Sequence, residues 1–186
     1  MAISSESGGF SKSKYMILQF TVKDISLEYN KQNNGKTTDI SLEVSVERVK
    51  KDGLVQDSKL YVDGNYKKDG NGVVGAWGSA FKIKEFILAC VPGLKFSADD
   101  QGKIADDIFQ QCIDKEIFVL KYLSTKDNGE ETYRTYNIFS DDMLKLEKKF
   151  LKDVERSMVY KYSPELASDD TSFKPFPEND TSEPVI

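Results

Sequence analysis

A strict alternation of apolar and polar residues is the feature that most limits how this chain can fold. Between residues 40 and 47, every even-numbered residue is Ile, Leu or Val, and every odd-numbered residue is Ser or Glu. Successive side chains of a strand point to opposite faces of a sheet. The pattern therefore predicts a strand with one buried face and one face in water, and such a strand needs neighbours.

The flanking segments predict these neighbours. Residues 15–29 have the pattern of a long strand, and its apolar alternation changes phase at Lys23 and Asp24. Such a phase change indicates a β-bulge, which bends a strand strongly. Residues 54–62 predict a third strand. The turn sequences at 31–36 (KQNNGK) and 51–53 (KDG) separate the three, so we expect an antiparallel meander.

Helical signals follow the meander. The glycine-rich residues 63–78 predict a mobile loop, and Ser79 is positioned to cap a helix over residues 80–91. The spacing of apolar residues predicts a second short helix near residues 100–112.

Two more strands complete the expected sheet, over residues 116–123 and 132–139, joined by a turn at 126–129 (KDNG). Residues 116–123 are apolar on both faces, so this strand is expected to be central. Five antiparallel strands with a helical insertion between strands 3 and 4 is the order of an OB-fold. We therefore predict a mainly β chain of the α+β class, a five-stranded OB-fold-like antiparallel barrel. A different five-stranded α+β domain is the alternative.

The ends of the chain differ from its middle. Residues 1–13 are rich in Ser, Gly and Lys and predict a flexible arm before a domain over residues 14–161. Residues 162–186 hold one Lys against six Asp or Glu, together with Pro and Ser, and predict a disordered acidic tail. Such a tail after a neutral or basic domain can occupy a binding groove or recruit partner proteins.

A C-terminal helix is expected over residues 141–160, capped by residues 140–142 (SDD). Leu144, Leu151 and Met158 recur every seven residues and, with Phe150 and Val154 beside them, predict its apolar stripe. The sequence leaves open whether this stripe packs on the same barrel or on a second copy.

The composition argues against catalysis. The chain has no His and only two Cys, so the usual general base and most catalytic zinc sites are missing. Cys90 and Cys112 lie in apolar helical patterns and are expected to be buried free thiols. No apolar run approaches the length of a membrane span, and no secretory signal is visible. We therefore expect a cytoplasmic, non-enzymatic protein with no cofactor, no metal and no membrane partner.

Basic residues interleaved with aromatic residues give the strongest functional signal. Binding of single-stranded nucleic acid needs Lys or Arg along the phosphates and aromatic faces for the bases. Each aromatic is as well explained as a core or rim residue, and each lysine as an ordinary solvated charge. The candidate DNA-binding residues are Lys36, Arg48, Lys59, Tyr61, Trp77, Lys82, Lys121, Tyr122, Tyr133, Arg134 and Tyr136.

Residues 15–140 also resemble a known family. The resemblance is carried by residues 15–24 (YMILQFTVKD), 40–44 (ISLEV) after an Asn-Gly turn, Trp77 before 81–86 (FKIKEF), 113–119 (IDKEIFV), and 133–138 (YRTYNI) after a second Asn-Gly turn. In these segments the chain resembles phage-encoded single-stranded DNA-binding proteins of the OB-fold type. The resemblance implies a protein that coats single strands in DNA replication or recombination, in the cytoplasm of the host cell.

The leading hypothesis is thus sequence-tolerant, non-catalytic binding of single-stranded DNA, with the tail serving autoinhibition or partner recruitment. One alternative is a protein-interaction module, such as a phage inhibitor of a host protein that acts through its acidic surface. Another is a structural or assembly protein that uses the helix at 141–160 as the seam of a homo-oligomer.

Overall fold

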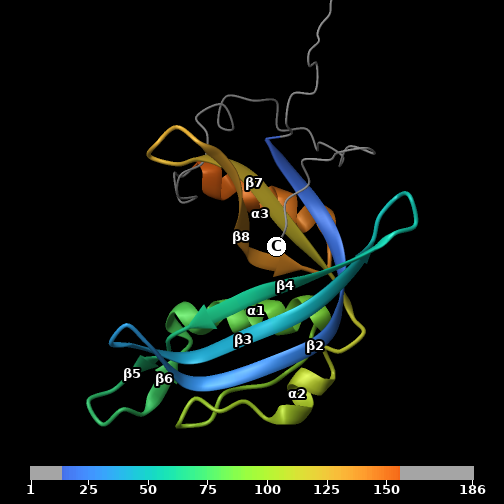
Figure 1. Ribbon diagram of the computed structural model, residues 1–186. Helices are drawn as coiled ribbons and strands as arrows, with labels where there is room; N and C mark the ends of the chain where they lie inside the picture. The colour runs from blue at the N-terminus through green and yellow to red at the C-terminus, as the bar shows by residue number, and fades with distance from the viewer. Residues whose placement is uncertain (1–13, 156–186) are drawn as a thin grey trace, which may run out of the picture.

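A computed structural model describes residues 14–155 of the protein (Figure 1). Five strands form one antiparallel sheet in the order β4-β3-β2-β7-β8. A small hairpin and four helical segments complete the fold. The elements are β2 (Tyr15–Asn33), β3 (Lys36–Val49), β4 (Val55–Gly64), β5 (Lys67–Lys68), β6 (Val74–Ala76), the 3-10 turn η1 (Gly78–Ala80), α1 (Phe81–Cys90), α2 (Asp106–Gln110), β7 (Glu116–Thr125), β8 (Glu131–Ser140) and α3 (Met143–Glu155).

Strand β2 joins the two halves of the sheet. Its first part pairs with β7, and the part after Thr21 pairs with β3. The register shifts between Val22 and Asp24, which confirms the predicted bulge. The bend turns the β3–β4 half away from the β7–β8 half, as Figure 1 shows. The predicted meander of the first three strands is confirmed as well.

The sheet stays open. Strands β4 and β8 are its two edges, and within residues 14–155 they do not pair with each other. Helix α1 packs against both edges, and Phe86 meets Phe139 of β8 edge to face at 5.9 Å between ring centroids. A mainly β chain with a helix between its third and fourth long strands is thus observed. The closed barrel is not, because the helix fills the seam that strand pairing would close.

Each face of the sheet has its own core. On one face, Phe20 and Val44 pack with α1 and α2. On the other face, Tyr15, Leu120 and Tyr122 pack under α3. Helices therefore cover both sides of the first part of β2 and of β7, which explains why these segments are apolar on both faces.

Helix α3 begins as predicted, and its buried stripe agrees with the prediction in part. The carboxylate of Asp142 accepts a hydrogen bond from the Lys145 amide at 3.1 Å, so the expected cap is confirmed. The residues facing the sheet are Leu146, Phe150 and Val154, four apart, with Leu151 packed against the same cluster. The predicted stripe is therefore confirmed for Phe150, Val154 and Leu151 and was wrong for Leu144, which is 68% exposed. Met158, the arm and the tail lie outside the described residues.

The segment predicted as a mobile glycine-rich loop is ordered. It forms the β5–β6 hairpin and η1, and two of its glycines are required by close backbone contacts. A Cβ on Gly64 would lie 2.4 Å from the Ala80 Cα, and one on Gly78 would lie 2.5 Å from the Asn65 carbonyl oxygen. Ser79 does not cap α1: its hydroxyl accepts from the Asn65 amide at 2.9 Å instead.

The helix predicted near residues 100–112 is shorter than expected. Only Asp106–Gln110 is helical. Residues 99–103 form a turn in which the Asp99 carboxylate accepts from the amides of Gln101 and Lys103, at 2.8 and 2.9 Å. Asx turns of this kind compete with helix formation at Asp.

Candidate nucleic-acid interface

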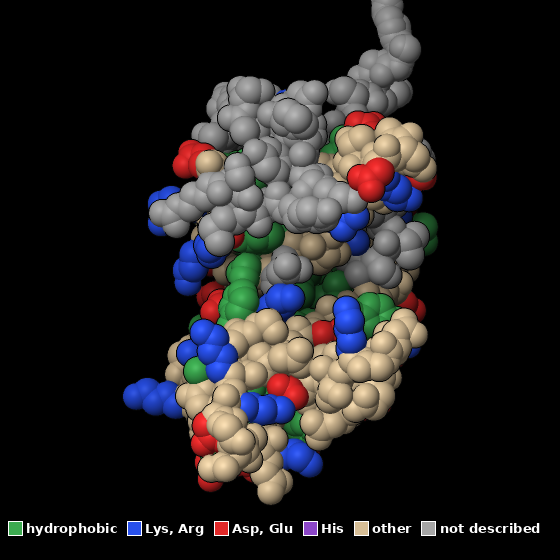
Figure 2. All heavy atoms as spheres, turned by 90° about the vertical axis from the view of Figure 1, so that its left-hand side faces the viewer, with side chains coloured by type: hydrophobic (Ala, Val, Ile, Leu, Met, Phe, Trp, Pro, Cys, Tyr) green, Lys and Arg blue, Asp and Glu red, His purple; other side chains and the backbone are tan. Residues whose placement is uncertain are grey.

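Figure 2 shows Lys and Arg side chains spread over one side of the molecule, with Asp and Glu side chains among them. This side carries the β5–β6 hairpin, the N-terminal end of α1 and the turn between β7 and β8, on the left in Figure 1. The eleven sequence-predicted residues are not all on it, and several have a structural role that removes them from any surface.

Tyr122 and Tyr136 are buried beneath α3, only 6% and 7% exposed. Their rings lie 5.6 and 5.3 Å from the ring centroid of Phe150. The Tyr136 hydroxyl donates to the carboxylate of Asp153, and burial together with this hydrogen bond raises the Tyr136 pKa. Neither ring has a face open to a base, so we correct both assignments: they are core residues.

Lys121 is also buried, at 3% exposure. It lies in register with Met16 on one side and Thr135 on the other. Burial lowers the pKa of Lys121 from 10.5 to about 8. In the folded domain its ammonium group is not open to a phosphate, so this assignment is corrected too. On the neighbouring strand, Tyr133 and Arg134 are half-buried, and they point to opposite faces of β8.

Lys59 and Tyr61 lie on the outer face of β4 and are exposed. Lys59 Nζ lies 2.5 Å from the Glu43 Oε1, and this hydrogen bond lowers the pKa of Glu43. The register places further carboxylates on the same face of β3 and β4, so the face is acidic overall and repels phosphates. These carboxylates belong to Glu43, Glu47, Asp57 and Asp63.

Lys36 and Arg48 lie near opposite ends of β3. Lys36 is exposed beside the β2–β3 turn, and Arg48 is half-buried in register with Gln56. The structure therefore does not gather the predicted basic residues into one surface. Trp77 and Lys82 are the predicted pair that it does bring to one corner.

Trp77 is held by an aromatic cluster. Its ring centroid lies 5.7 Å from that of Tyr66 and 5.8 Å from that of Phe96, and Lys84 Nζ lies 6.0 Å from it. The Tyr66 hydroxyl donates to the Gly102 carbonyl at 2.9 Å, and burial raises the Tyr66 pKa. The indole is therefore half-buried and fixed in position, with a cation close to its ring.

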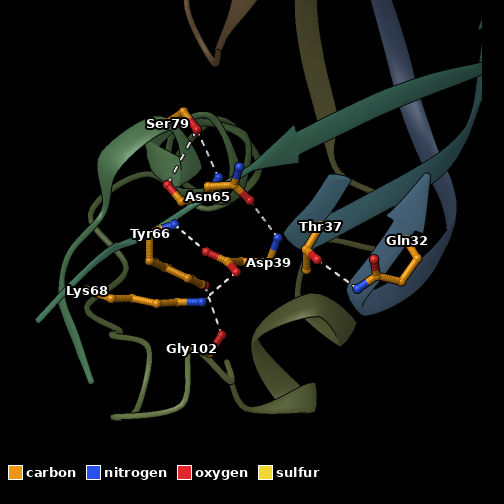
Figure 3. Close-up of polar contacts among 8 residues, drawn as sticks. All are labelled: Gln32, Thr37, Asp39, Asn65, Tyr66, Lys68, Ser79 and Gly102. Atoms are coloured by element: carbon orange, nitrogen blue, oxygen red, sulfur yellow. Dashed lines mark hydrogen bonds and ion pairs between the residues drawn. The ribbon is translucent and has the colours of Figure 1, made fainter. Parts of the chain in front are cut away.

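A polar network fixes the backbone around this cluster (Figure 3). The Asp39 carboxylate accepts from the Tyr66 amide at 2.8 Å and from Lys68 Nζ at 2.6 Å. The Asn65 side-chain oxygen accepts from the Asp39 amide at 2.7 Å, and Ser79 holds the Asn65 amide. The network ties the end of β4 to the start of α1, so the residues at this helix start are rigidly presented.

Three further residues complete what we call the α1 corner. Phe81 is 40% exposed at the first position of α1, and Lys84, about one helical turn later on the same side, is the residue whose Nζ lies near the Trp77 ring. Lys67 lies in register with Ala76, next to Trp77. Lys67 and Lys82 form no ion pair within residues 14–155. The α1 corner comprises Lys67, Trp77, Phe81, Lys82 and Lys84.

Sequence reasoning missed Phe81 and Lys84 as site residues. The two lie three apart in a segment expected to be helical, which places them on one side of that helix and was a usable signal. Lys67 had a signal in the sequence, the run of Tyr66, Lys67 and Lys68 before Trp77, although its position next to Trp77 depends on the β5–β6 pairing.

The described residues offer no group of three or more Cys, Asp or Glu side chains that could hold a metal ion. Cys90 and Cys112 are buried free thiols, as predicted, and the hydrogen bond that the Cys90 thiol donates to Cys112, together with burial, raises the Cys90 pKa. No helix between residues 14 and 155 is long and apolar enough to cross a membrane.

No protein-family model matches the sequence, and a search of curated proteins finds no match either. The functional argument therefore rests on the chain itself.

Proposed function

We propose that this protein binds single-stranded DNA without catalysis, and that the α1 corner is the centre of its binding surface. The observation that supports the proposal is the fixed indole of Trp77 with Lys84 Nζ near its ring, together with the exposed Phe81 three residues before Lys84 on α1. Aromatic faces stack on any base, and ammonium groups follow the phosphates. Such a surface is sequence-tolerant.

The expected affinity and its salt dependence follow from the number of stacked bases and of phosphate contacts. Stacking contributes about 1–3 kcal/mol per base. Each phosphate contact with a single strand contributes about 0.7 to the slope of log affinity against log salt. Three lysines at the corner therefore predict a slope of about −2 for log affinity against log salt. Binding to duplex DNA should be weaker, because the bases of a duplex are not open for stacking.

We also propose that the open sheet is a variant of the OB-fold. The supporting observation is the order of its elements: β2, β3 and β4 form a meander, a helix follows, and β7 returns to pair with β2. In this proposal α1 takes the place of pairing between β4 and β8. The resemblance to phage single-stranded DNA-binding proteins adds a role in replication or recombination, with the acidic tail blocking the empty surface or recruiting partner proteins.

One alternative has an observation in its favour. The outer face of β3 and β4 carries Glu43, Glu47, Asp57 and Asp63, with Tyr61 exposed among them. A protein-interaction module or inhibitor that acts through an acidic surface would use this face. The assembly alternative is not favoured by α3, whose apolar stripe packs on its own sheet.

Fluorescence anisotropy of a labelled oligo-dT of about 30 nucleotides tests the proposal. The full chain is titrated at several salt concentrations, alone and against duplex competitor. Since Trp77 is the only Trp in the chain, its fluorescence reports on the corner in the same titration. We expect salt-sensitive binding to the single strand with a change in Trp fluorescence.

Matched variants locate the surface. Lys82→Gln with Lys84→Gln should lower the salt slope by about 1.4, and Phe81→Ala should weaken stacking. Lys31→Gln with Lys115→Gln removes the same charge from exposed positions elsewhere and should leave binding unchanged. No binding at low salt would refute the proposal and favour the acidic face. If every variant binds with the same affinity and salt slope as the original chain, the α1 corner is not the binding surface.

A further inference from the structure

The acidic and basic side chains of helix α3 lie mostly on opposite sides of the helix. Two of its three acids turn toward the sheet: the Tyr15 hydroxyl donates to Glu147 Oε1 at 2.5 Å, and the Tyr136 hydroxyl donates to Asp153. Both carboxylates are buried. These two acids thus leave the outer surface of the helix.

The lysines of α3 all remain outside. They are exposed, and they occur at i, i+3, i+4 and i+7, which places them along one side of a helix over about 10 Å. We call this surface the α3 lysine face; it consists of Lys145, Lys148, Lys149 and Lys152. The remaining acid, Glu155, lies at the end of the described helix.

Two of these lysines have no carboxylate partner in the described part of the chain. Lys145 lies 3.8 Å from Asp141, and Lys149 lies 2.9 Å from Asp153. Lys148 and Lys152 form no ion pair with any residue between 14 and 155. Their charges are therefore available to an anionic ligand.

The helix that carries the lysine face is firmly anchored. Phe150 is completely buried, and its ring centroid lies 5.4 Å from that of Tyr15, between Tyr122 and Tyr136. Because this packing and the two tyrosine–carboxylate hydrogen bonds fix the helix, the spacing of the outer lysines is set before any ligand binds. Preorganised charges lose less conformational entropy on binding.

We propose that the α3 lysine face is a second phosphate-binding surface, which holds the backbone of the single strand that the α1 corner binds. This inference rests on the proposed function. Val119 packs on the side of the sheet covered by α1, and Leu120 packs on the side covered by α3, so the two surfaces lie on opposite faces of the β7–β8 hairpin. A strand that reaches both surfaces passes around that hairpin.

The chemistry favours a nucleic-acid backbone over a lipid surface. A helix that lies on a membrane inserts an apolar face. The apolar stripe of α3 is used by the sheet, and Leu144 is its one large apolar residue exposed in the described part. A row of lysines without an exposed apolar face suits a polyanion, because phosphates bind to cations and do not require apolar side chains to be buried.

Oligonucleotides of two lengths distinguish binding at the α1 corner from binding at the α3 lysine face. An oligo-dT of about 10 nucleotides is sized for one surface, and one of about 30 can engage both. Lys148→Gln with Lys152→Gln should weaken binding of the longer strand roughly 25-fold at 0.1 M salt, the effect of about 1.4 in salt slope. The shorter strand should bind as before, and Lys31→Gln with Lys115→Gln serves as the matched control.

Lysine footprinting gives a readout independent of affinity. Acetylation of the full chain, read by mass spectrometry, should show Lys148 and Lys152 protected by the longer strand and reactive with the shorter one. Equal affinity of variant and original chain for the longer strand, or unprotected lysines, would overturn the α3 proposal while leaving the α1 corner intact. Failure of both strands to bind the original chain would refute the proposed function itself. Binding of the original chain to anionic phosphatidylserine vesicles, lost in the variant, would reassign the face to membranes.

Discussion

Replacing Phe150 by Ala tests the packing that decides which aromatics are core residues. Its side chain is fully buried in a ring of Tyr15, Tyr122 and Tyr136, with centroid distances of 5.3 to 5.6 Å. Replacing a buried Phe by Ala lowers the free energy of unfolding by about 3–5 kcal/mol. With three aromatic neighbours losing their contacts, we expect about 4 kcal/mol here. That is a large part of the about 5–15 kcal/mol expected for a whole domain.

Leu144→Ala is the matched control on the same helix. Leu144 belongs to the stripe predicted from the seven-residue spacing, yet it is largely exposed. We therefore expect its free energy of unfolding to change by less than about 0.5 kcal/mol.

Urea unfolding followed by circular dichroism measures both variants. With a slope of about 2 kcal/mol per molar urea, the midpoint of Phe150→Ala should fall by about 2 M. A loss of less than about 1.5 kcal/mol for Phe150→Ala, or an equal loss for Leu144→Ala, would show that α3 does not dock on the sheet in this way. Tyr122 and Tyr136 would then return to the candidate surface.

Two further predictions each concern a single position inside the fold. Lys121→Met should raise stability at pH 7 by up to about 3 kcal/mol, because it removes a buried cation whose pKa is lowered to about 8. The original chain should gain stability between about pH 8 and 10.5, where the unfolded Lys121 still holds a proton that the folded one has lost. Urea midpoints across that range should rise more steeply for the original chain than for the variant, and parallel curves would contradict the assignment. Gly78→Ala should cost more than about 1 kcal/mol, since φ is +56° there and the new Cβ would lie 2.5 Å from the Asn65 carbonyl. An unchanged melting temperature for this variant would contradict the close contact.

Local turn chemistry was the most predictable part of the fold. Asn34 and Gly35 both have positive φ, 51° and 76°, as a two-residue hairpin turn requires. Four other turns share one pattern: the first amide donates to the fifth carbonyl, and a Gly with positive φ is fourth. They span residues 50–54, 69–73, 99–103 and 126–130.

The sequence predicts the first and last of these turns, whereas it predicts a mobile loop and part of a helix at the middle two. Both middle turns begin with an Asp whose carboxylate accepts from the amides two and four residues later. The repeated spacing of Asp and Gly was therefore a readable signal.

The candidate site was less predictable because burial depends on where distant elements dock. Nothing near Tyr136 in the sequence specifies that α3 covers it. For Tyr122 a signal did exist: its strand is apolar on both faces, which means that both faces are covered. A central strand covered on both faces cannot also present the Tyr122 ring to DNA. The two expectations were therefore inconsistent, and in the structure Tyr122 is buried.

The net charge of −5 averages over surfaces that a ligand meets one at a time. Carboxylates collect on the outer face of β3 and β4, while the α1 corner and the α3 lysine face present ammonium groups. At 0.1 M salt, exposed charges more than about 10 Å apart are largely screened from each other. A phosphate at either lysine surface therefore responds to the nearby ammonium groups rather than to the total charge. The same screening makes the two surfaces separable: a change at one should alter the salt slope by its own share, and the two shares should add in a chain that carries both changes.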